Sequence, residues 1–430
     1  MAGVGSRNCR AGALTVRALG AAMASVTLGS AAAYEGDGNW LRFGPTETTR
    51  GDTTDRAFIR EWEANPPKGF PTLSAANIEA TKAAIQRYKV IVGRGGWKPV
   101  PEVQLRAGAT DPAVGILRSR LSLSGDLRED SGYTSAEHFD YYLEKAVKRF
   151  QASNGLTPTG VVDKRTIAAL NVPAAIRLRQ LQQNLSRLAE YSRSAGKRYV
   201  VVNIPAAQIE AVENDRVISR HSGVVGKPDR ATPILRTSIH EMNFNPVWHL
   251  PPTVIQQDLI PKGRDMQRKG QNVLVKYGID AYDGNGKKLD PGKINWTSGL
   301  PMALSYRQQP GKDNPLGFLK INFHNSHSVY MHDTPSESLF GRNFRAASSG
   351  CVRVQGIEQL AAWLLADQGN WSAERIENMK KNGERLDVKL KRPMPLYFVY
   401  ITAWATEDGI VQFRRDLYQK DGVGPTASAY

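Results

Sequence analysis

Cysteine is almost absent from this chain of 430 residues, whose two thiols are Cys9 and Cys351. The first 33 residues hold three arginines, no acidic residue and an apolar run that ends in Ser-Ala-Ala-Ala. This pattern is typical of a cleaved export signal, with the mature chain starting near Tyr34. Cleavage would leave Cys351 alone. A lone thiol outside the cytoplasm cannot form an internal disulfide, so Cys351 is a candidate reactive group.

Long apolar runs and metal-type clusters are also missing. No segment after the leader is apolar enough to span a bilayer, so we expect a soluble exported protein. An uncleaved N-terminal membrane anchor is the alternative. No His-Cys cluster with zinc-type spacing is present, and one remaining thiol cannot form a multi-thiolate site. The sequence therefore predicts chemistry without a metal or an organic cofactor.

Acidic residues are scarce relative to basic ones: 41 Asp and Glu stand against 57 Lys and Arg, for a net charge of +16. This balance favours an anionic partner. The basic residues are scattered and no recognised nucleic-acid motif occurs, so nucleic acid is a poor match. A carboxylate-rich cell-wall polymer fits both the charge and the export signal. A merely solvated basic surface is the alternative.

The most informative stretch surrounds His332 and Cys351. Residues 328–332 alternate as in a strand, with Val329 and Met331 on one face and Tyr330 and His332 on the other. Cys351 follows a Ser-Ser-Gly turn and precedes an amphipathic helix whose apolar positions are Ile357, Leu360, Ala361, Leu364 and Leu365. A thiol in such a turn is accessible to a substrate.

This pair of side chains suits acyl transfer. A neighbouring imidazole removes the thiol proton and stabilises the thiolate as an ion pair, and the thiolate then attacks a carbonyl. Gly350 permits close backbone approach, and the N–H groups near Gly350 and Cys351 are candidates to hold an oxyanion. The pair alone is equally compatible with a buried structural cysteine beside a core histidine.

The two motifs, His-Asp-Thr at 332–334 and Ser-Ser-Gly-Cys-Val-Arg-Val at 348–354, resemble the signature of the L,D-transpeptidase catalytic domain, the YkuD fold. Their spacing is similar to that of the Gram-negative branch typified by YcbB. Further segments that resemble this branch follow its order, at residues 245–248, 251–252, 307–311, 314–317 and 331–335. The resemblance implies that Cys351 is the nucleophile and His332 the base.

The resemblance also implies roles for residues around this pair. Arg353 is expected to meet a substrate carboxylate, with a structural ion pair as the alternative. The carbonyl of Asp333 is expected to orient the imidazole, and Tyr330 to line the pocket. Trp248 is expected to shape the donor site, with core packing as the alternative. Ser349 stands where many relatives carry a histidine, so it is assigned to substrate binding and not to a second catalytic imidazole.

We expect an α+β multidomain protein with a mainly-β catalytic domain. The expected boundaries are 1–33 export signal, 34–108 scaffold region, 109–172 peptidoglycan-binding domain, 173–197 linker helix, 198–420 catalytic domain and 421–430 tail. Three short helices in 109–172 resemble the peptidoglycan-binding domain family; a plain helical spacer is the alternative. A helix capped by Ser74 is expected in the scaffold region, and Pro173 is expected to open the linker helix.

From residue 199 the pattern becomes strand-like. Strands are expected at residues 199–204, 207–212, 217–225, 318–323, 328–332, 397–403 and 409–413, the last two joined through Asp408-Gly409. Residues of about 250–306 are less regular and rich in Pro, Gly, Lys and Asp. Their position resembles the capping subdomain of YcbB-type enzymes, which implies a mobile lid. A disordered insertion is the alternative.

The resemblance implies a periplasmic enzyme of cell-wall synthesis and cell shape, sensitive to carbapenems. It would cross-link third residues of peptidoglycan stem peptides through a thioester on Cys351. The acceptor is expected to be another stem peptide or an outer-membrane protein. Two alternatives are open: an L,D-carboxypeptidase or endopeptidase on the same substrate, in which water resolves the thioester, and a non-catalytic wall-binding scaffold.

Overall fold

The computed structural model describes residues 69–127 and 135–424. The predicted export signal and the first part of the predicted scaffold region lie outside these residues, so those predictions are not tested. Within the described ranges, no helix combines the length and the apolar character that crossing a bilayer requires.

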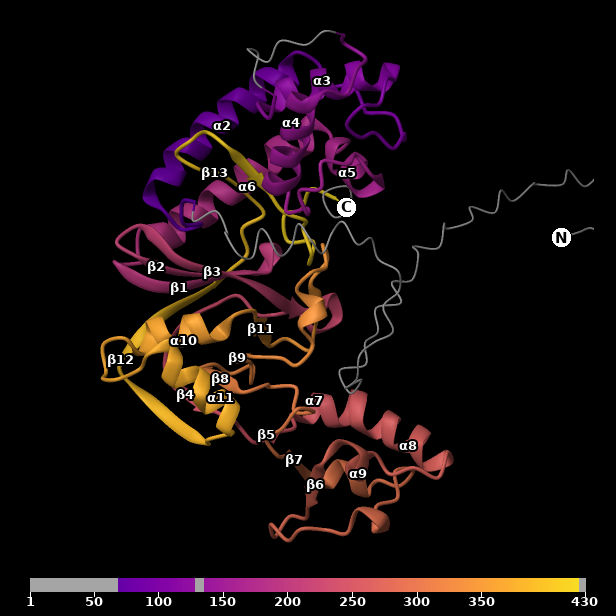
Figure 1. The fold of residues 1–430 in the computed structure, drawn as a ribbon, viewed down its shortest axis with the longest axis vertical. Helices are drawn as coiled ribbons and strands as arrows, with labels where there is room; N and C mark the ends of the chain where they lie inside the picture. The colour runs from indigo at the N-terminus through magenta and orange to yellow at the C-terminus, as the bar shows by residue number, and fades with distance from the viewer. Residues whose placement is uncertain (1–68, 128–134, 425–430) are drawn as a thin grey trace, which may run out of the picture. The chain divides into compact units, whose positions relative to one another are not determined.

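Two long helices pack against each other (Figure 1): α2 (Ala75–Gly93) and α6 (Ala174–Ser192). The hydroxyl of Ser74 accepts the first free N–H of α2, so the predicted cap is confirmed. The leucines of α6 recur at helical spacing, and Leu181 and Leu188 are fully buried. The predicted linker helix therefore packs along one stripe of its surface.

A three-helix module follows α2, as the sequence predicts. Its helices are α3 (Pro112–Ser124), α4 (Tyr141–Ser153) and α5 (Lys164–Leu170). Each begins at an aspartate whose carboxylate accepts free backbone N–H groups of the first turn, namely Asp111, Asp140 and Asp163. The apolar faces of the three helices enclose one small core.

The catalytic region is built on a nine-stranded sheet in the order β10-β3-β11-β9-β8-β4-β12-β1-β2. Because β3 also pairs with β2, the sheet closes on itself. Its strands are β1 (Arg198–Asn203), β2 (Gln208–Glu213), β3 (Arg216–Gly226), β4 (Leu235–Phe244), β8 (Leu319–Phe323), β9 (Met331–His332), β10 (Ala346–Ser348), β11 (Val352–Val354) and β12 (Leu386–Val399).

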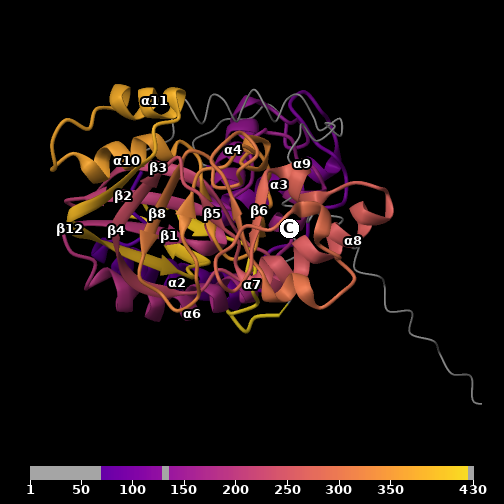
Figure 2. The same ribbon diagram turned by 90° about the horizontal axis from the view of Figure 1, so that it is seen from below.

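Side-chain alternation places one core inside this sheet and another outside it. Along β1, Val200 and Val202 point into the inner core, while Tyr199 and Val201 pack against Leu188 of α6. The inner core is completed by α10 (Ile357–Leu365), whose predicted apolar stripe is buried, and α11 (Ala373–Asn382) packs beside α10 (Figure 2). The outer face of the sheet is thus available for contacts with helices and with a substrate.

Residues 248–308 form an ordered subdomain with its own core. Its elements are β5 (Trp248–His249), α7 (Pro252–Val254), a π-helical turn (Ile255–Leu259), α8 (Ile260–Arg268), α9 (Val273–Tyr277), β6 (Ile279–Tyr282) and β7 (Ser305–Gln308). Gly263 lies against Trp296, where an added Cβ would be 2.2 Å from the indole ring. The alternative of a disordered insertion is therefore wrong. The predicted lid motion stays a prediction.

Several expected strands have other bounds than predicted. Residues 328–330 are not in a strand, because Ser328 has φ of 55° and the side chain of Asn325 takes both the N–H and the carbonyl of Val329. Strand β9 is therefore Met331–His332 alone. Tyr330 and His332 nevertheless contact each other through their rings, with centroids 5.6 Å apart.

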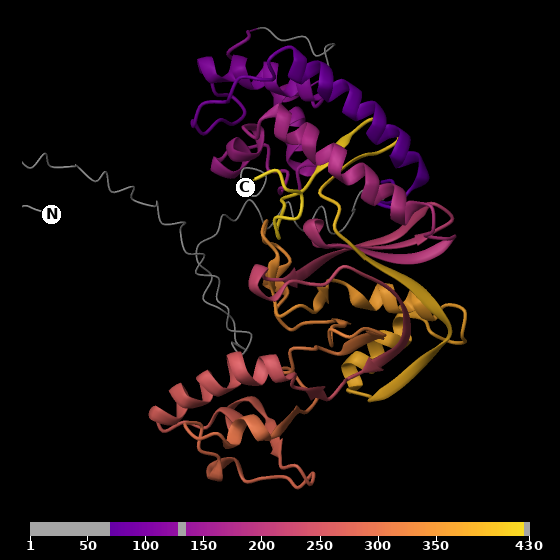
Figure 3. The ribbon, with the colours of Figure 1, turned by 180° about the vertical axis from the view of Figure 1, so that it is seen from behind.

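The expected strand at 397–403 ends at Val399, the last residue of the long strand β12 that runs beside β4 (Figure 3). The amides of Asn203 and Asn184 hydrogen-bond to the backbone of Ile401 and Thr402 and replace sheet hydrogen bonds there. A terminal hairpin follows with its turn at the predicted Asp408-Gly409, but its strands are β13 (Ala403–Ala405) and β14 (Val411–Phe413), because residues 397–399 pair with β1 and β4. Short 3₁₀ turns occur at Ile204–Ala206, Pro228–Arg230, Pro291–Lys293, Leu300–Ala303 and Glu337–Leu339.

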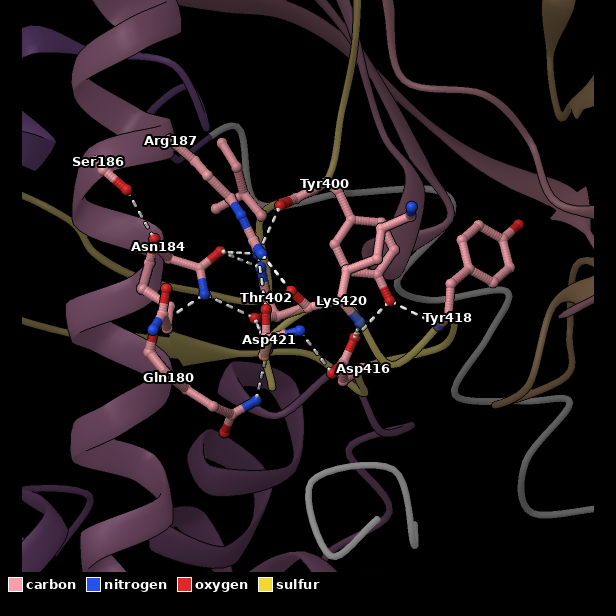
Figure 4. A network of polar contacts seen from close by, with 12 residues as sticks. Gln180, Asn184, Ser186, Arg187, Tyr400, Thr402, Asp416, Tyr418, Lys420 and Asp421 are labelled. Atoms are coloured by element: carbon pink, nitrogen blue, oxygen red, sulfur yellow. Dashed lines mark hydrogen bonds and ion pairs between the residues drawn. The ribbon is translucent and has the colours of Figure 1, made fainter. Parts of the chain in front are cut away.

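A buried polar network ties α6 to the end of the chain (Figure 4). The carboxylate of Asp421 is 2.6 Å from a guanidinium nitrogen of Arg187 and accepts a hydrogen bond from the Thr402 hydroxyl. The amide of Asn184 donates to the same hydroxyl. Because Asp421 and Val423 are 3% and 5% exposed, the packed part of the chain extends into the predicted tail.

We expect the substitution Asp421→Ala to lower the free energy of unfolding by about 3 kcal/mol, because it removes the buried carboxylate that pairs with the half-buried Arg187 and bonds to Thr402. The matched control is Glu79→Ala, which removes an exposed ion pair with Lys82 and should change it by about 0.5 kcal/mol. Urea unfolding followed by tryptophan fluorescence measures both. Equal effects of the two substitutions would contradict this account of the network.

Candidate active site

Three adjacent strands bring the predicted site together. In the antiparallel pair β8–β9, Lys320 lies opposite His332, and in the parallel pair β9–β11, His332 lies beside Arg353. Side chains at paired positions share a face of the sheet. Lys320, His332 and Arg353 therefore form one row on the outer face, while Met331 and Val352 point into the inner core.

The thiol of Cys351 lies next to Tyr330 at the start of β11. The N–H of Val352 donates to the carbonyl of Tyr330 at 3.0 Å, which fixes the two segments side by side. The Tyr330 hydroxyl accepts the indole N–H of Trp248 at 2.9 Å. Trp248 is also part of the subdomain core. Its contacts are therefore compatible with both expected roles, packing in the core and shaping of the donor site. Cys351 itself is partly exposed.

The turn before Cys351 is held by side-chain hydroxyls. Gly350 has φ of 112°, which favours glycine, and its N–H donates to the hydroxyl of Ser348 at 3.1 Å. The carbonyl of Gly350 accepts from the Thr232 hydroxyl at 2.8 Å. The Gly350 N–H is thus occupied, whereas the N–H of Cys351 has no partner among the described residues. Of the two expected oxyanion donors, Cys351 is the better placed.

His332 is buried and its ring is fixed by backbone carbonyls. Its Nδ1 lies 2.5 Å from the carbonyl of Asp333, the contact expected to orient the imidazole. Burial, followed by the charge of Arg353, lowers the pKa of His332 to about 3, although the carbonyls of Asp333 and Pro315 oppose this shift. The ring is therefore neutral at physiological pH and can accept a proton through Nε2.

Burial raises the pKa of the Cys351 thiol to about 11, while hydrogen bonds from Tyr330 and the charges of Lys320 and Arg353 act to lower it. The resting site therefore holds a neutral thiol and a neutral imidazole. The ion pair expected from the sequence does not form under these pKa values. Proton transfer must then accompany substrate binding or attack.

Arg353 has an open guanidinium. Burial lowers its pKa to about 10, one of its terminal nitrogens is 3.4 Å from the Thr334 hydroxyl, and its Nε has no partner. Within residues 69–127 and 135–424, no carboxylate forms an ion pair with it. The alternative of a structural ion pair finds no support among these residues. A buried, unpaired guanidinium is suited to bind a substrate carboxylate.

Ser349 takes part in a bridge to the subdomain at 248–308. Its hydroxyl accepts a hydrogen bond from Arg230 at 2.8 Å, and Arg230 forms an ion pair with Asp258 at 2.6 Å. Asp258 belongs to the π-helical turn of that subdomain. The residue assigned to substrate binding thus connects the turn of the nucleophile to the predicted lid.

Sequence reasoning missed several groups that support the site. The Tyr418 hydroxyl donates to the carbonyl of Gly226 at 2.6 Å and accepts the N–H of Thr232 at 3.2 Å, so it fixes the residue that holds Gly350. Lys320 lies in a predicted strand, but only the pairing of this strand with β9 shows that Lys320 is next to His332. Across the described ranges, no group of three or more His, Cys, Asp or Glu side chains could hold a metal ion.

The fold and the site define a mainly-β catalytic domain with a cysteine, a histidine and two cations on one face. Residues 197–383 match the family model of the YkuD L,D-transpeptidase catalytic domain, and residues 110–170 match that of the "Putative peptidoglycan binding domain". The chain thus combines a YkuD L,D-transpeptidase catalytic domain with a peptidoglycan-binding domain, and the resemblance and fold class expected from the sequence are confirmed.

A curated relative from Haemophilus influenzae, named "Putative L,D-transpeptidase", is 32% identical over 223 residues. The match covers 52% of this chain and 44% of that relative, so the chain spans less than half the length of the relative. Solved L,D-transpeptidases are also similar. That of Xylanimonas cellulosilytica has 16% identity, 70% coverage of this chain, 100% coverage of its own and a TM-score of 0.23. That of Stackebrandtia nassauensis has 12% identity, 69% coverage of this chain, 94% coverage of its own and a TM-score of 0.26.

The raised pKa of the thiol predicts a pH profile. The rate of alkylation of Cys351 by iodoacetamide should rise steadily with pH through the range 8 to about 11, because only the thiolate reacts. No step should occur near pH 6.5, because His332 is already neutral there. Mass spectrometry of the peptide that contains Cys351 measures the rate. A plateau below pH 8 would contradict the neutral-thiol state.

The charge of Lys320 is expected to assist ionisation of the thiol. Replacing it in Lys320→Met should slow alkylation of Cys351 at pH 8 by roughly three- to tenfold, because the pKa of the thiol rises further. The matched control is Lys389→Met, which removes an exposed lysine from β12. If both variants react at the wild-type rate, Lys320 does not act on the thiol.

Proposed function

We propose that this protein is a peptidoglycan L,D-transpeptidase that joins third residues of stem peptides through a thioester on Cys351. The observation that carries the proposal is the shared sheet face of His332, Arg353 and Lys320, with Cys351 beside it. This face lies within the segment that matches the catalytic family model. The alternative of a non-catalytic scaffold gives no reason for a lone thiol beside a buried histidine and two cations.

In the first step, the sulfur of Cys351 bonds to the carbonyl carbon of the third residue of a donor tetrapeptide. The thiol proton passes to Nε2 of His332, and the N–H of Cys351 holds the oxyanion. Collapse breaks the amide bond, and the leaving D-alanine amine takes the proton from His332. Arg353 is proposed to bind the carboxylate of the donor, because its guanidinium lacks a carboxylate partner among the described residues.

In the second step, a side-chain amine of an acceptor stem attacks the thioester carbonyl. His332 accepts a proton from the attacking amine and returns it to the sulfur as the carbon–sulfur bond breaks. The product is an amide between two third residues, and the thiol is regenerated. Resolution by water would instead release a tripeptide. We propose the periplasm as the place of action, with other stem peptides as acceptors; an outer-membrane protein is a further candidate acceptor.

We expect the full-length protein to convert wall fragments that carry tetrapeptide stems into dimers joined at third residues. The variants Cys351→Ala and His332→Ala should lose at least about a thousandfold in rate, because each removes one part of the proton-transfer pair. Liquid chromatography with mass spectrometry of the muropeptides measures the products. The control is His327→Ala, which alters an exposed histidine from the loop before β9 and should react as the wild type does.

The mass of the intact protein gives a second measurement on the same samples. A carbapenem or the tetrapeptide should add one acyl group to Cys351. Tripeptides without dimers would assign the carboxypeptidase activity instead. If the tetrapeptide is not consumed and the mass of the protein does not change, only the wall-binding alternative is left.

A further inference from the structure

A second recess lies outside the site of Cys351. It has a volume of about 150 Å³, and its walls come from the three-helix module at residues 152–158 and from the catalytic region at residues 206–222 and 340–345. None of the residues on the shared sheet face lines it. We propose that this recess binds the carboxylate-bearing terminal residue of a second stem peptide, an inference that rests on the proposed function.

The charge of the recess favours an anion. Three arginines line it, namely Arg342, Arg345 and Arg414, and no aspartate or glutamate is among its lining residues. Cations that gather in a concave surface with no acidic residue in its lining create a positive potential that attracts a carboxylate. Ligands without a negative charge would gain no binding free energy from this potential.

Two of the arginines are fixed in place by backbone carbonyls. Arg345 donates to the carbonyls of Gly223, Arg342 and Ala206 at 2.9 to 3.2 Å. Arg414 donates to the carbonyl of Ser153 at 2.8 Å. Carbonyls orient a guanidinium but do not neutralise its charge, so the positive potential of the recess is preorganised.

Arg342 differs from the other two. Its side chain is half-buried and makes no hydrogen bond or ion pair with any described residue, so its five N–H donors are available. Gln208 and Ser222 line the same recess, and their side chains make no hydrogen bond to the residues that the structure describes. These groups provide the donors that a terminal carboxylate and its neighbouring amide require.

The size of the recess limits its ligand. A cavity of about 150 Å³ holds a molecule the size of benzene. One terminal residue of a peptide with a small side chain fits this volume, whereas a disaccharide does not. Because one wall belongs to the peptidoglycan-binding domain, a stem peptide is the source of carboxylate that this chain would meet.

The recess is connected to the turn of the nucleophile. The side-chain oxygen of Asn343 accepts both the N–H and the hydroxyl of Thr157, at 2.8 and 2.9 Å, and so joins the helical module to the loop after His332. This loop continues into β10 and then into Cys351. A peptide held here would be tethered by the same segment that carries the catalytic thiol.

The test uses the full-length protein with Cys351 alkylated by iodoacetamide, which blocks the donor site. Calorimetric titration with a soluble stem tetrapeptide should detect one binding event. The substitution Arg342→Ala should weaken binding at least tenfold, and Arg342→Lys should restore part of it. The tetrapeptide with a C-terminal carboxamide should bind at least tenfold more weakly than the acid. The control variant Arg353→Ala, altered in the donor site, should bind as the alkylated wild type does.

Hydrogen exchange of the same samples locates the ligand. Protection of the amides in 154–158 and 340–345 on addition of tetrapeptide is expected. The inference is overturned if Arg353→Ala abolishes binding while Arg342→Ala leaves it unchanged. It is also overturned if the carboxamide binds as tightly as the acid, or if no binding is detected. Failure of the proposed function is separate, because it would appear as absence of an acyl group on the unmodified thiol in the intact mass.

Discussion

The site depends on the parallel pairing of β9 with β11. This register sets His332 beside Arg353, brings Tyr330 next to Cys351, and turns Met331 and Val352 inward. A shift of one residue would exchange the two faces, burying the imidazole in the apolar core and exposing its methionine neighbour. The apolar inner core therefore enforces the catalytic geometry, since only one register keeps both the core and the site intact.

The turn of the nucleophile is also connected to the helical scaffold through polar contacts. The Tyr400 hydroxyl donates to Asp416 at 2.6 Å and accepts the N–H of Tyr418. The Tyr418 hydroxyl holds Thr232, whose hydroxyl in turn holds the carbonyl of Gly350. Asp416 also accepts backbone N–H groups next to the network that binds α6 (Figure 4). Residues 416–421 thus help to fix the turn before Cys351, although they are distant from this motif in sequence.

Two places in the described residues hold cations without a carboxylate partner, namely the site around Cys351 and the recess lined by Arg342. At the thiol of Cys351, burial raises the pKa more than the charges of Lys320 and Arg353 lower it, which favours the neutral thiol. In the recess between the helical module and the catalytic region, the same lack of acidic partners leaves Arg342 open. Both places thus present cationic side chains that have no carboxylate partner among the described residues.

Local sequence determined the helices and their caps, such as Ser74 before α2 and Asp163 before α5, because capping and helical periodicity act within a few residues. It also pointed to Cys351 as the candidate nucleophile, since one thiol remains outside the predicted leader, and to the family, through motifs that are contiguous in the chain. Only the tertiary structure decided that β12 ends at Val399, that Lys320 faces His332, that Gly350 has no free N–H and that Ser349 is held by Arg230. Each of these depends on partners that are distant in sequence, and strand register and burial, which set those partners and the pKa values, are properties of the folded chain as a whole.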